Sequence, residues 1–197
     1  MNELIEATAT EIIEPVRPET YIDKFRDCYK LAQVICQANT IPDAYKNKAA
    51  DCAIAIDMAN RMNVTPIFVM QNLYVVKGKP SWSGQACTAL INACGKFSDV
   101  QHLYFGQPDT DGRGCRVVAK HADTGELIEG PAVTMAMAKA EGWTSNPKWR
   151  NMPELMLAYR AASFFARVHC PQALMGLSTE GEAEDSVKTK RTAEDVL

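Results

Sequence analysis

The sequence predicts an α+β fold in which helices flank a β-hairpin and a small three-stranded antiparallel sheet. Apolar residues recur at three- and four-residue steps from Thr20 to Ala38, which is the periodicity of an amphipathic helix. Short segments of strand-like composition, separated by turn-rich links, then follow between residues 73 and 133. At 197 residues the chain is long enough for one domain with a hydrophobic core.

The first half is expected to be mostly helical, with one hairpin. LYVV at 73–76, the turn at 77–80 and the PSWS segment have the composition of two short strands joined by a glycine turn. The helices are expected over 20–38, from Pro42-Asp43 to about Met62, in a short turn that Thr65-Pro66 starts, and over 83–95.

The second half carries the predicted sheet and the longest basic helix. Three strand-like segments, at about 100–105, 114–121 and 126–133, are joined by turns and therefore predict an antiparallel meander. Thr134 is expected to cap a short helix that runs to about Glu141. After a loop, a helix that starts near Pro153 is expected to end at residues 169–171.

Acidic residues are concentrated at both ends of the chain. We expect a flexible arm over 1–19, a core domain over 20–177 and an acidic, disordered tail over 178–197. The net charge is −3, yet residues 21–177 hold 17 of the 21 basic residues and 13 of the 24 acidic ones. This mildly basic middle supports nucleic-acid binding only weakly, because many neutral enzymes have the same balance.

Composition excludes several protein classes. There is no apolar run near the ~20 residues that span a bilayer, and the acidic first residues do not resemble a secretory signal, so we expect a cytoplasmic protein. Neither a G-x-G-x-x-G strand–helix turn nor a Walker loop occurs, and we expect no cofactor. The cysteines form no CxxC pair and are expected to be reduced core thiols: Cys28, Cys36, Cys52, Cys87, Cys94, Cys115 and Cys170.

The segment KWRNMPELMLAYRAASFFAR, residues 148–167, is the most informative part of the chain. Its two helical arginines, Arg160 and Arg167, are seven residues apart and therefore lie on one side of the helix. Glu154 is the one carboxylate in this segment, so an anion outside the chain, such as a nucleic-acid backbone, is an obvious partner. Pairing of each arginine with a carboxylate of the core or surface is the alternative.

Lys148 and Arg150 flank Trp149 in a predicted loop ahead of this helix. Basic residues interleaved with an aromatic ring suit contacts with phosphates combined with base stacking. A tryptophan that anchors the loop on the core is an equally good interpretation of Trp149.

Other candidate contacts with DNA lie in the hairpin, the sheet and the short helix. Lys77 and Lys79 stand at the predicted hairpin tip beside Trp82, where a hairpin can wedge between bases or form a plain solvated turn. In the sheet, strand alternation puts Arg116 and Lys120 on one face, which is either a DNA contact or a solvated surface. Lys139 on the short helix is a further candidate.

Glu182, Glu184 and Asp185 form an acidic cluster in the predicted tail. A metal site is one interpretation, and a tail that repels DNA or increases solubility is the one we favour. A tail that competes with DNA for the basic groove is a third hypothesis.

The order of segments from about Asn63 to Asp185 closely resembles the RecT and Redβ superfamily of phage recombination proteins, which are single-strand annealing proteins. No single short motif decides the resemblance; the ordered set does. The segments are NVTPIFVMQNLYVVKGKPSWSGQACTALI, GCRVVAKHADTGE, GPAVTMAMAKAEGW, PKWRNMPELMLAYRAASFFARV and GEAED.

The resemblance implies an ATP-independent protein, not an enzyme, that coats single-stranded DNA and pairs it with its complement. It implies a homo-oligomer, as a ring or helical filament, in which Arg160 and Arg167 face a continuous basic groove. It also implies a partner 5′→3′ exonuclease and a host single-strand-binding protein. The annealed duplex is the expected product.

Two other classes remain open. A nuclease-like DNA-processing enzyme requires clustered carboxylates or a nucleophile on a rigid scaffold, whereas the acids of the core are scattered. A structural or partner-binding phage protein would use the arginine-bearing helix as an oligomer interface.

Overall fold

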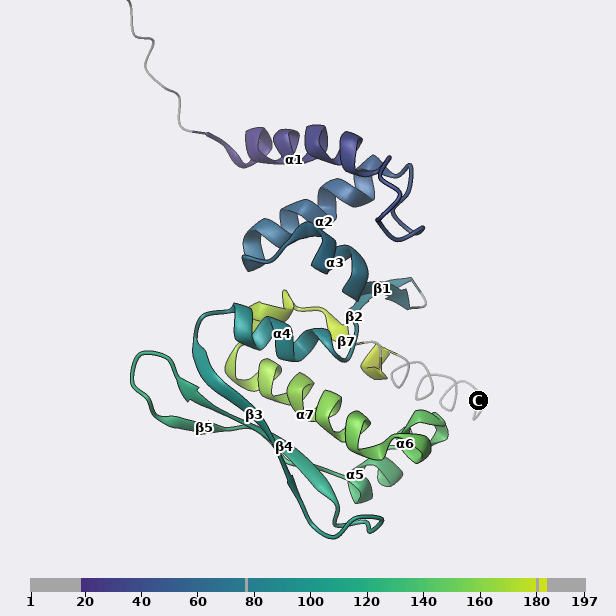
Figure 1. Ribbon diagram of the computed structural model, residues 1–197, viewed down its shortest axis with the longest axis vertical. Helices are drawn as coiled ribbons and strands as arrows, with labels where there is room; N and C mark the ends of the chain where they lie inside the picture. The colour runs from purple at the N-terminus through teal and green to yellow at the C-terminus, as the bar shows by residue number, and fades with distance from the viewer. Residues whose placement is uncertain (1–18, 77, 180, 184–197) are drawn as a thin grey trace, which may run out of the picture.

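The computed structural model describes residues 19–76, 78–179 and 181–183. It confirms the α+β class: a group of helices at the top of Figure 1, a hairpin in the middle, and a long helix against a sheet at the bottom. The predicted arm over 1–19 lies outside the described residues except for Glu19, and so does most of the predicted tail.

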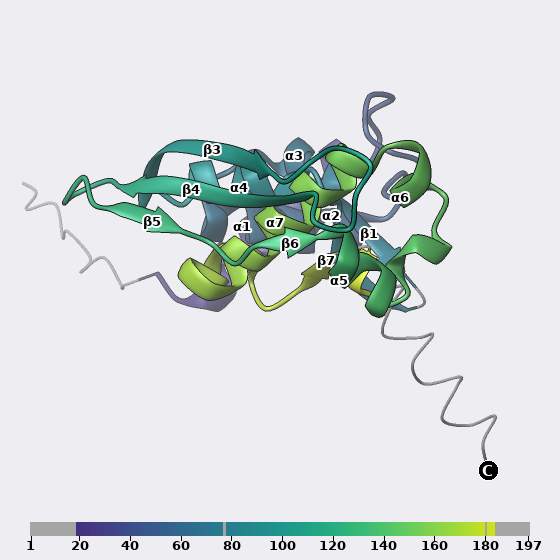
Figure 2. The ribbon, with the colours of Figure 1, turned by 90° about the horizontal axis from the view of Figure 1, so that it is seen from below.

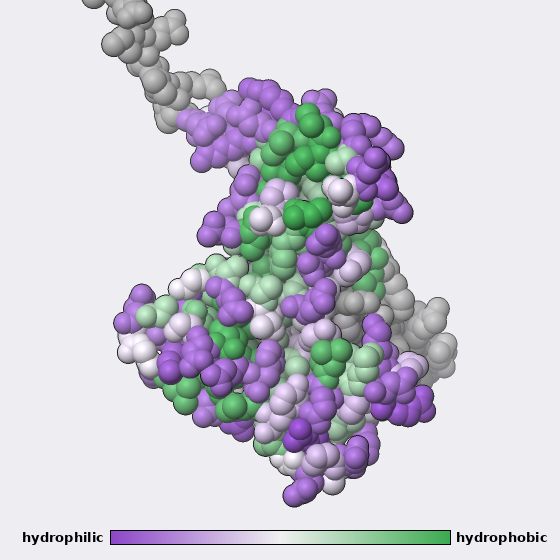
Figure 3. Space-filling model, viewed as in Figure 1, coloured by the Kyte–Doolittle hydropathy of each residue, from purple (hydrophilic) through white to green (hydrophobic). Residues whose placement is uncertain are grey.

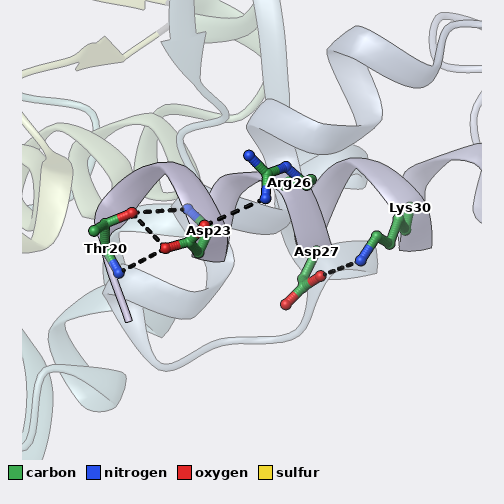
Figure 4. A network of polar contacts seen from close by, with 5 residues as sticks. All are labelled: Thr20, Asp23, Arg26, Asp27 and Lys30. Atoms are coloured by element: carbon green, nitrogen blue, oxygen red, sulfur yellow. Dashed lines mark hydrogen bonds and ion pairs between the residues drawn. The ribbon is translucent and has the colours of Figure 1, made fainter. Parts of the chain in front are cut away.

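The upper group of helices consists of α1 (Tyr21–Ile35), α2 (Ala49–Met62) and α3 (Pro66–Asn72). A capping box fixes the start of α1, because the Thr20 hydroxyl accepts from the amide of Asp23 and the Asp23 carboxylate accepts from the amide of Thr20, as Figure 4 shows. Helix α2 begins later than predicted. Asn47, at φ +59°, interrupts the helical path before it.

Small residues form the contact between α1 and α2. Ala32 of α1 and Ala53 and Ala59 of α2 are fully buried, which lets the two helices approach closely. Apolar side chains also remain exposed on α1, Ile22 and Val34 among them, and hydrophobic surface interrupts the hydrophilic surface of the upper helices in Figure 3.

The predicted hairpin is confirmed as β1 (Leu73–Val76) and β2 (Lys79–Trp82). Gly78 has φ +81° in the tight turn between them, a conformation that favours glycine. A short strand that the sequence did not indicate, β7 (Ser178–Thr179), pairs in parallel with β2. The prediction of a disordered tail from residue 178 is therefore wrong for these first residues.

The larger sheet has four strands rather than the three predicted. The central strand is β4 (Gly114–His121); β3 (Phe97–Phe105) pairs with one edge, and β5 (Leu127–Glu129) and β6 (Val133–Thr134) share the other. Figure 2 shows these strands side by side.

Gly130 and Pro131 divide the predicted third strand into β5 and β6. The backbone at Gly130 lies so close to helix α7 that a Cβ there would be 2.8 Å from a ring carbon of Phe165. Proline has no amide to donate to a ladder, so pairing is interrupted here.

Strand β3 contains a bulge. Its pairing with β4 shifts register between Ser98 and Gln101, and Asp99 between them has φ +53°. The bulge brings the Asp99 carboxylate to 3.0 Å from the ammonium of Lys120 on β4.

The basic helix is α7 (Pro153–His169), which packs on β4. Leu157, Ala161 and Phe165 are fully buried on the packed side. Helix α4 (Ala86–Ala93) packs against α7 as well, so α7 lies between a helix and the sheet in the centre of the core.

Two short helices precede α7. As predicted, the Thr134 hydroxyl caps α5 (Met135–Ala140) by accepting from the amide of Met137. The predicted loop around Trp149 is instead the single-turn helix α6 (Lys148–Asn151), which follows a 3-10 turn at Trp143–Ser145.

The cysteines are free, and all except the half-buried Cys94 are buried, as predicted for core thiols. Burial raises the pKa of Cys87 to about 12, so this thiol stays protonated at neutral pH. No helix among the described residues has the length and apolar composition needed to cross a membrane.

Candidate nucleic-acid interface

Both arginines of α7 are engaged by other groups of the chain. Arg160 is only 8% exposed, and its guanidinium lies over the ring of Trp143 at 4.0 Å from the ring centre. Arg167 lies two turns further along and forms an ion pair of 2.6 Å with Glu182. Arg167 therefore pairs with a carboxylate of its own chain, which was the alternative to an external anion.

Glu182 is at the centre of a polar cluster. Its carboxylate accepts from the Ser163 hydroxyl at 2.9 Å and from both the amide and the hydroxyl of Thr179 at 2.8 Å. Burial alone would raise the pKa of the Glu182 carboxyl, but hydrogen bonds from Thr179 and Arg167 outweigh it and hold the pKa below its usual value. Glu184 and Asp185 lie outside the described residues, so the predicted acidic cluster is represented here by Glu182 alone.

Neither predicted tryptophan is available to stack on a base. Trp149 is 2% exposed and packs on Trp143 at 5.4 Å between ring centres, so it anchors α6 to the core. Trp82 is fully buried, and its indole N–H donates to the carbonyl of Leu174 at 3.1 Å. Burial therefore favours the anchoring interpretation of Trp149 and contradicts the expectation that Trp82 contacts DNA.

The cations of the sheet and of α5 are paired with carboxylates. An acid from a neighbouring strand, loop or helix lies beside each one, and the pairs of Arg116 and Lys120 are solvent-exposed, which fits the solvated-face alternative for these two residues. The pairs are Arg116 with Glu129 at 2.6 Å, Lys120 with Asp99 at 3.0 Å, Lys139 with Asp111, and Arg113 with Glu154 at 2.7 Å.

Lys148, Arg150 and Lys79 differ from these cations. Each is exposed and forms no ion pair with any residue in the described ranges. Lys148 and Arg150 lie on α6 and Lys79 begins β2, while Lys77 lies outside the described residues. These three side chains are the predicted cations that remain available to an external anion.

A cleft of about 310 Å³ lies where the hairpin, α6 and α7 meet. Lys148 and the Arg160 guanidinium lie on its wall, together with the ring of Tyr74, which is 47% exposed on β1. Of the described residues that line it, none is Asp or Glu. They are Tyr74, Ser83, Gly84, Gln85, Asn146, Lys148, Met152, Leu155, Met156, Tyr159, Arg160, Thr179 and Gly181.

The apolar wall of the cleft is the exposed side of α7. Met152, Leu155 and Tyr159 recur on it at three- and four-residue steps, opposite the residues that pack on the sheet. Gly84 closes the other side, so near that a Cβ built there would lie 2.8 Å from the ring of Tyr159. The cleft therefore combines two tyrosine rings, an apolar wall and two cations.

The sequence reasoning missed both tyrosines of this cleft as site residues. Tyr74 lies in the middle of LYVV, where Tyr74 and Val75 are both exposed, so the alternation of a strand gave no signal for it. Tyr159 was assigned to the apolar face of the basic helix, which is correct, but its position above Gly84 depends on tertiary packing.

A metal site is not formed within the described ranges, where no group of three or more His, Cys, Asp or Glu side chains has ligand geometry. Comparison with known proteins found no family model, no curated protein and no solved structure that matches this chain.

Proposed function

We propose that the protein binds single-stranded DNA in the cleft between the hairpin and α7 and pairs it with a complementary strand without ATP. The observation that supports this is the convergence of Lys148, Arg160, Tyr74 and Tyr159 on one cleft. Its volume of about 310 Å³ is at the lower end of the range for small-molecule sites and suits one nucleotide at a time.

Each part of the cleft has a role in this proposal. Lys148 neutralises a phosphate, and each neutralised phosphate contributes about −0.7 to the dependence of log K on log salt; Arg160, held over Trp143, adds positive charge to the wall of the cleft. Tyr74 and Tyr159 offer rings on which bases stack, at about 1–3 kcal/mol per base. Neither term depends on base identity, so the complement supplies the specificity.

Annealing requires strands held extended and accessible, and it requires no bond-making group, so the protein is not an enzyme in this proposal. One cleft accommodates too few nucleotides to align two strands, and a homo-oligomer, as a ring or filament, would join the clefts of neighbouring copies. A 5′→3′ exonuclease and a host single-strand-binding protein in the cytoplasm are the partners that fit such an activity.

The test is binding of a fluorescent oligonucleotide, followed by annealing of its complement, with Lys148→Glu and Tyr74→Ala variants. Reversal of the Lys148 charge should weaken strand binding about tenfold at low salt and reduce the salt slope by about 0.7. Tyr74→Ala should weaken binding at every salt concentration, because stacking is not a counterion effect.

Lys96→Glu is the matched control, since Lys96 is an exposed lysine without an ion pair to any described residue and lies between α4 and β3, outside the cleft lining. Equal loss in Lys96→Glu and Lys148→Glu would contradict the proposal. Absence of annealing, or cleavage of the strand when Mg²⁺ or Mn²⁺ is added, would favour a DNA-processing enzyme instead.

A further inference from the structure

The chain beyond Leu177 returns to the functional face and is held there. We call residues 178–179 and 181–183 the C-terminal strap. Its first part is β7, which pairs with β2, and its second part is anchored by Glu182 to Ser163 and Arg167 of α7. Glu182 also accepts from the amide and the hydroxyl of Thr179, three residues before it.

The strap lies over the cationic side of α7. A Cβ built at Gly181 would be 3.3 Å from a terminal nitrogen of Arg160, and both Thr179 and Gly181 line the cleft. Two turns along the helix, about 10.5 Å away, Glu182 covers Arg167. The strap therefore contacts both arginines of the row that continues from the cleft, and Arg167 stays partly exposed to solvent.

The surroundings of the Glu182 carboxylate are those of a bound oxyanion. A guanidinium N–H at 2.6 Å and a serine hydroxyl at 2.9 Å, both from α7, donate to it. A phosphate oxygen makes the same charge-assisted hydrogen bonds, and Arg is well suited to either acceptor. Ser163 and Arg167 thus form a site for an anion that the chain itself occupies.

We propose that the strap is an autoinhibitory contact, in which the Glu182 carboxylate occupies the place of a DNA phosphate on Ser163 and Arg167. Displacement of the strap lengthens the phosphate track from the cleft along α7 by at least one contact. This inference rests on the proposed single-strand binding and adds its regulation. Because strap and strand compete, each weakens the attachment of the other by the same factor.

The test compares oligonucleotide binding of the wild type, Glu182→Ala and Asp57→Ala across a salt series. Glu182→Ala should bind about fivefold more tightly at 0.1 M salt, with a slope steeper by about 0.7, the value for one additional phosphate contact. A double variant that combines Arg167→Gln with Glu182→Ala should lose both the tighter binding and the steeper salt slope. Asp57→Ala is the matched control, because it removes one negative charge and releases Arg61 on α2, outside the cleft lining.

A second measurement needs no variant. Hydrogen–deuterium exchange of the wild-type strap should become faster when oligonucleotide binds, and slower exchange or no change would overturn the inference. The inference would also be overturned if Glu182→Ala bound the strand with the affinity and salt slope of the wild type. It would be overturned as well if Asp57→Ala tightened binding as much as Glu182→Ala. In those cases the wild type still binds the strand, whereas failure of the wild type to bind would reject the proposed function itself.

Discussion

The cations of the sheet and Lys148 of the cleft occupy different electrostatic surroundings. Arg116 and Lys120 on β4 each lie beside a carboxylate of a neighbouring strand, Glu129 on β5 and Asp99 on β3. Lys148 on α6 has no carboxylate partner among the described residues. The difference arises from topology, because adjacent strands bring distant acids together, whereas a single-turn helix beside a loop meets none.

This difference decides which cations can recruit an external anion. A surface ion pair contributes only about 0–1 kcal/mol to stability, but it supplies a competitor that a phosphate must displace. An unpaired lysine beside apolar and aromatic surface has no such competitor. The proposed interface therefore centres on Lys148 and not on the density of basic residues along the sequence.

The largest expected effect concerns Trp149, whose ring packs the α6 side of the cleft on the core. Trp149→Ala removes the buried ring that packs on Trp143 and should lower the free energy of unfolding by about 3–5 kcal/mol. Urea denaturation measures this, with Arg150→Ala as the control, since the exposed neighbour should change stability by less than about 0.5 kcal/mol. A similar loss in both variants would show that Trp149 does not anchor α6.

An intermediate effect is expected when the cleft is narrowed. Gly84→Ala places a Cβ against the ring of Tyr159 and should cost about 1–3 kcal/mol of stability, with several-fold weaker strand binding, because the ring moves into the cleft. Gly112→Ala is the control, since the nearest atom to a Cβ there is 3.8 Å away. Thermal unfolding and fluorescence titration measure the two effects. Unchanged strand binding in a folded Gly84→Ala variant would place the strand elsewhere.

The smallest effect is expected in the sheet. Lys120→Gln should leave strand affinity within about twofold of the wild type, because Asp99 already neutralises this ammonium. A double-mutant cycle of Lys120→Gln with Asp99→Asn should give a coupling of about 0.2–1 kcal/mol in unfolding. If Lys120→Gln weakened binding as much as Lys148→Glu, the distinction between the two groups of cations would fail.

Local signals predicted the helices and the hairpin well. Thr65-Pro66 and Thr134 start helices through caps that involve only neighbouring residues, and β1 and β2 pair as a hairpin with Gly78 in its turn. The predicted start of α2 at Pro42 was wrong because Asn47 adopts a left-handed conformation that periodicity does not reveal. The split between β5 and β6 escaped prediction because it depends on contact with α7.

The candidate site could be predicted only in part. The sequence predicts the helix α7 correctly, since periodicity is a local property, and Lys148 lies in the lining of the cleft beside it. Arg167 pairs with Glu182, 15 residues along the chain, and Arg116 with Glu129, 13 residues along. Tertiary structure brings these partners together, and no local pattern predicts it. Likewise, burial of Trp82 depends on its bond to Leu174, which is 92 residues away.

The bulge at Asp99 has a consequence for how copies of this protein associate. Strand β3 is the outer strand of its sheet, and nine residues of free edge would otherwise attract the backbone of another molecule. The left-handed Asp99 breaks the straight row of amides and carbonyls, and its charge points to Lys120. Edge-to-edge extension of the sheet through β3 is thereby discouraged.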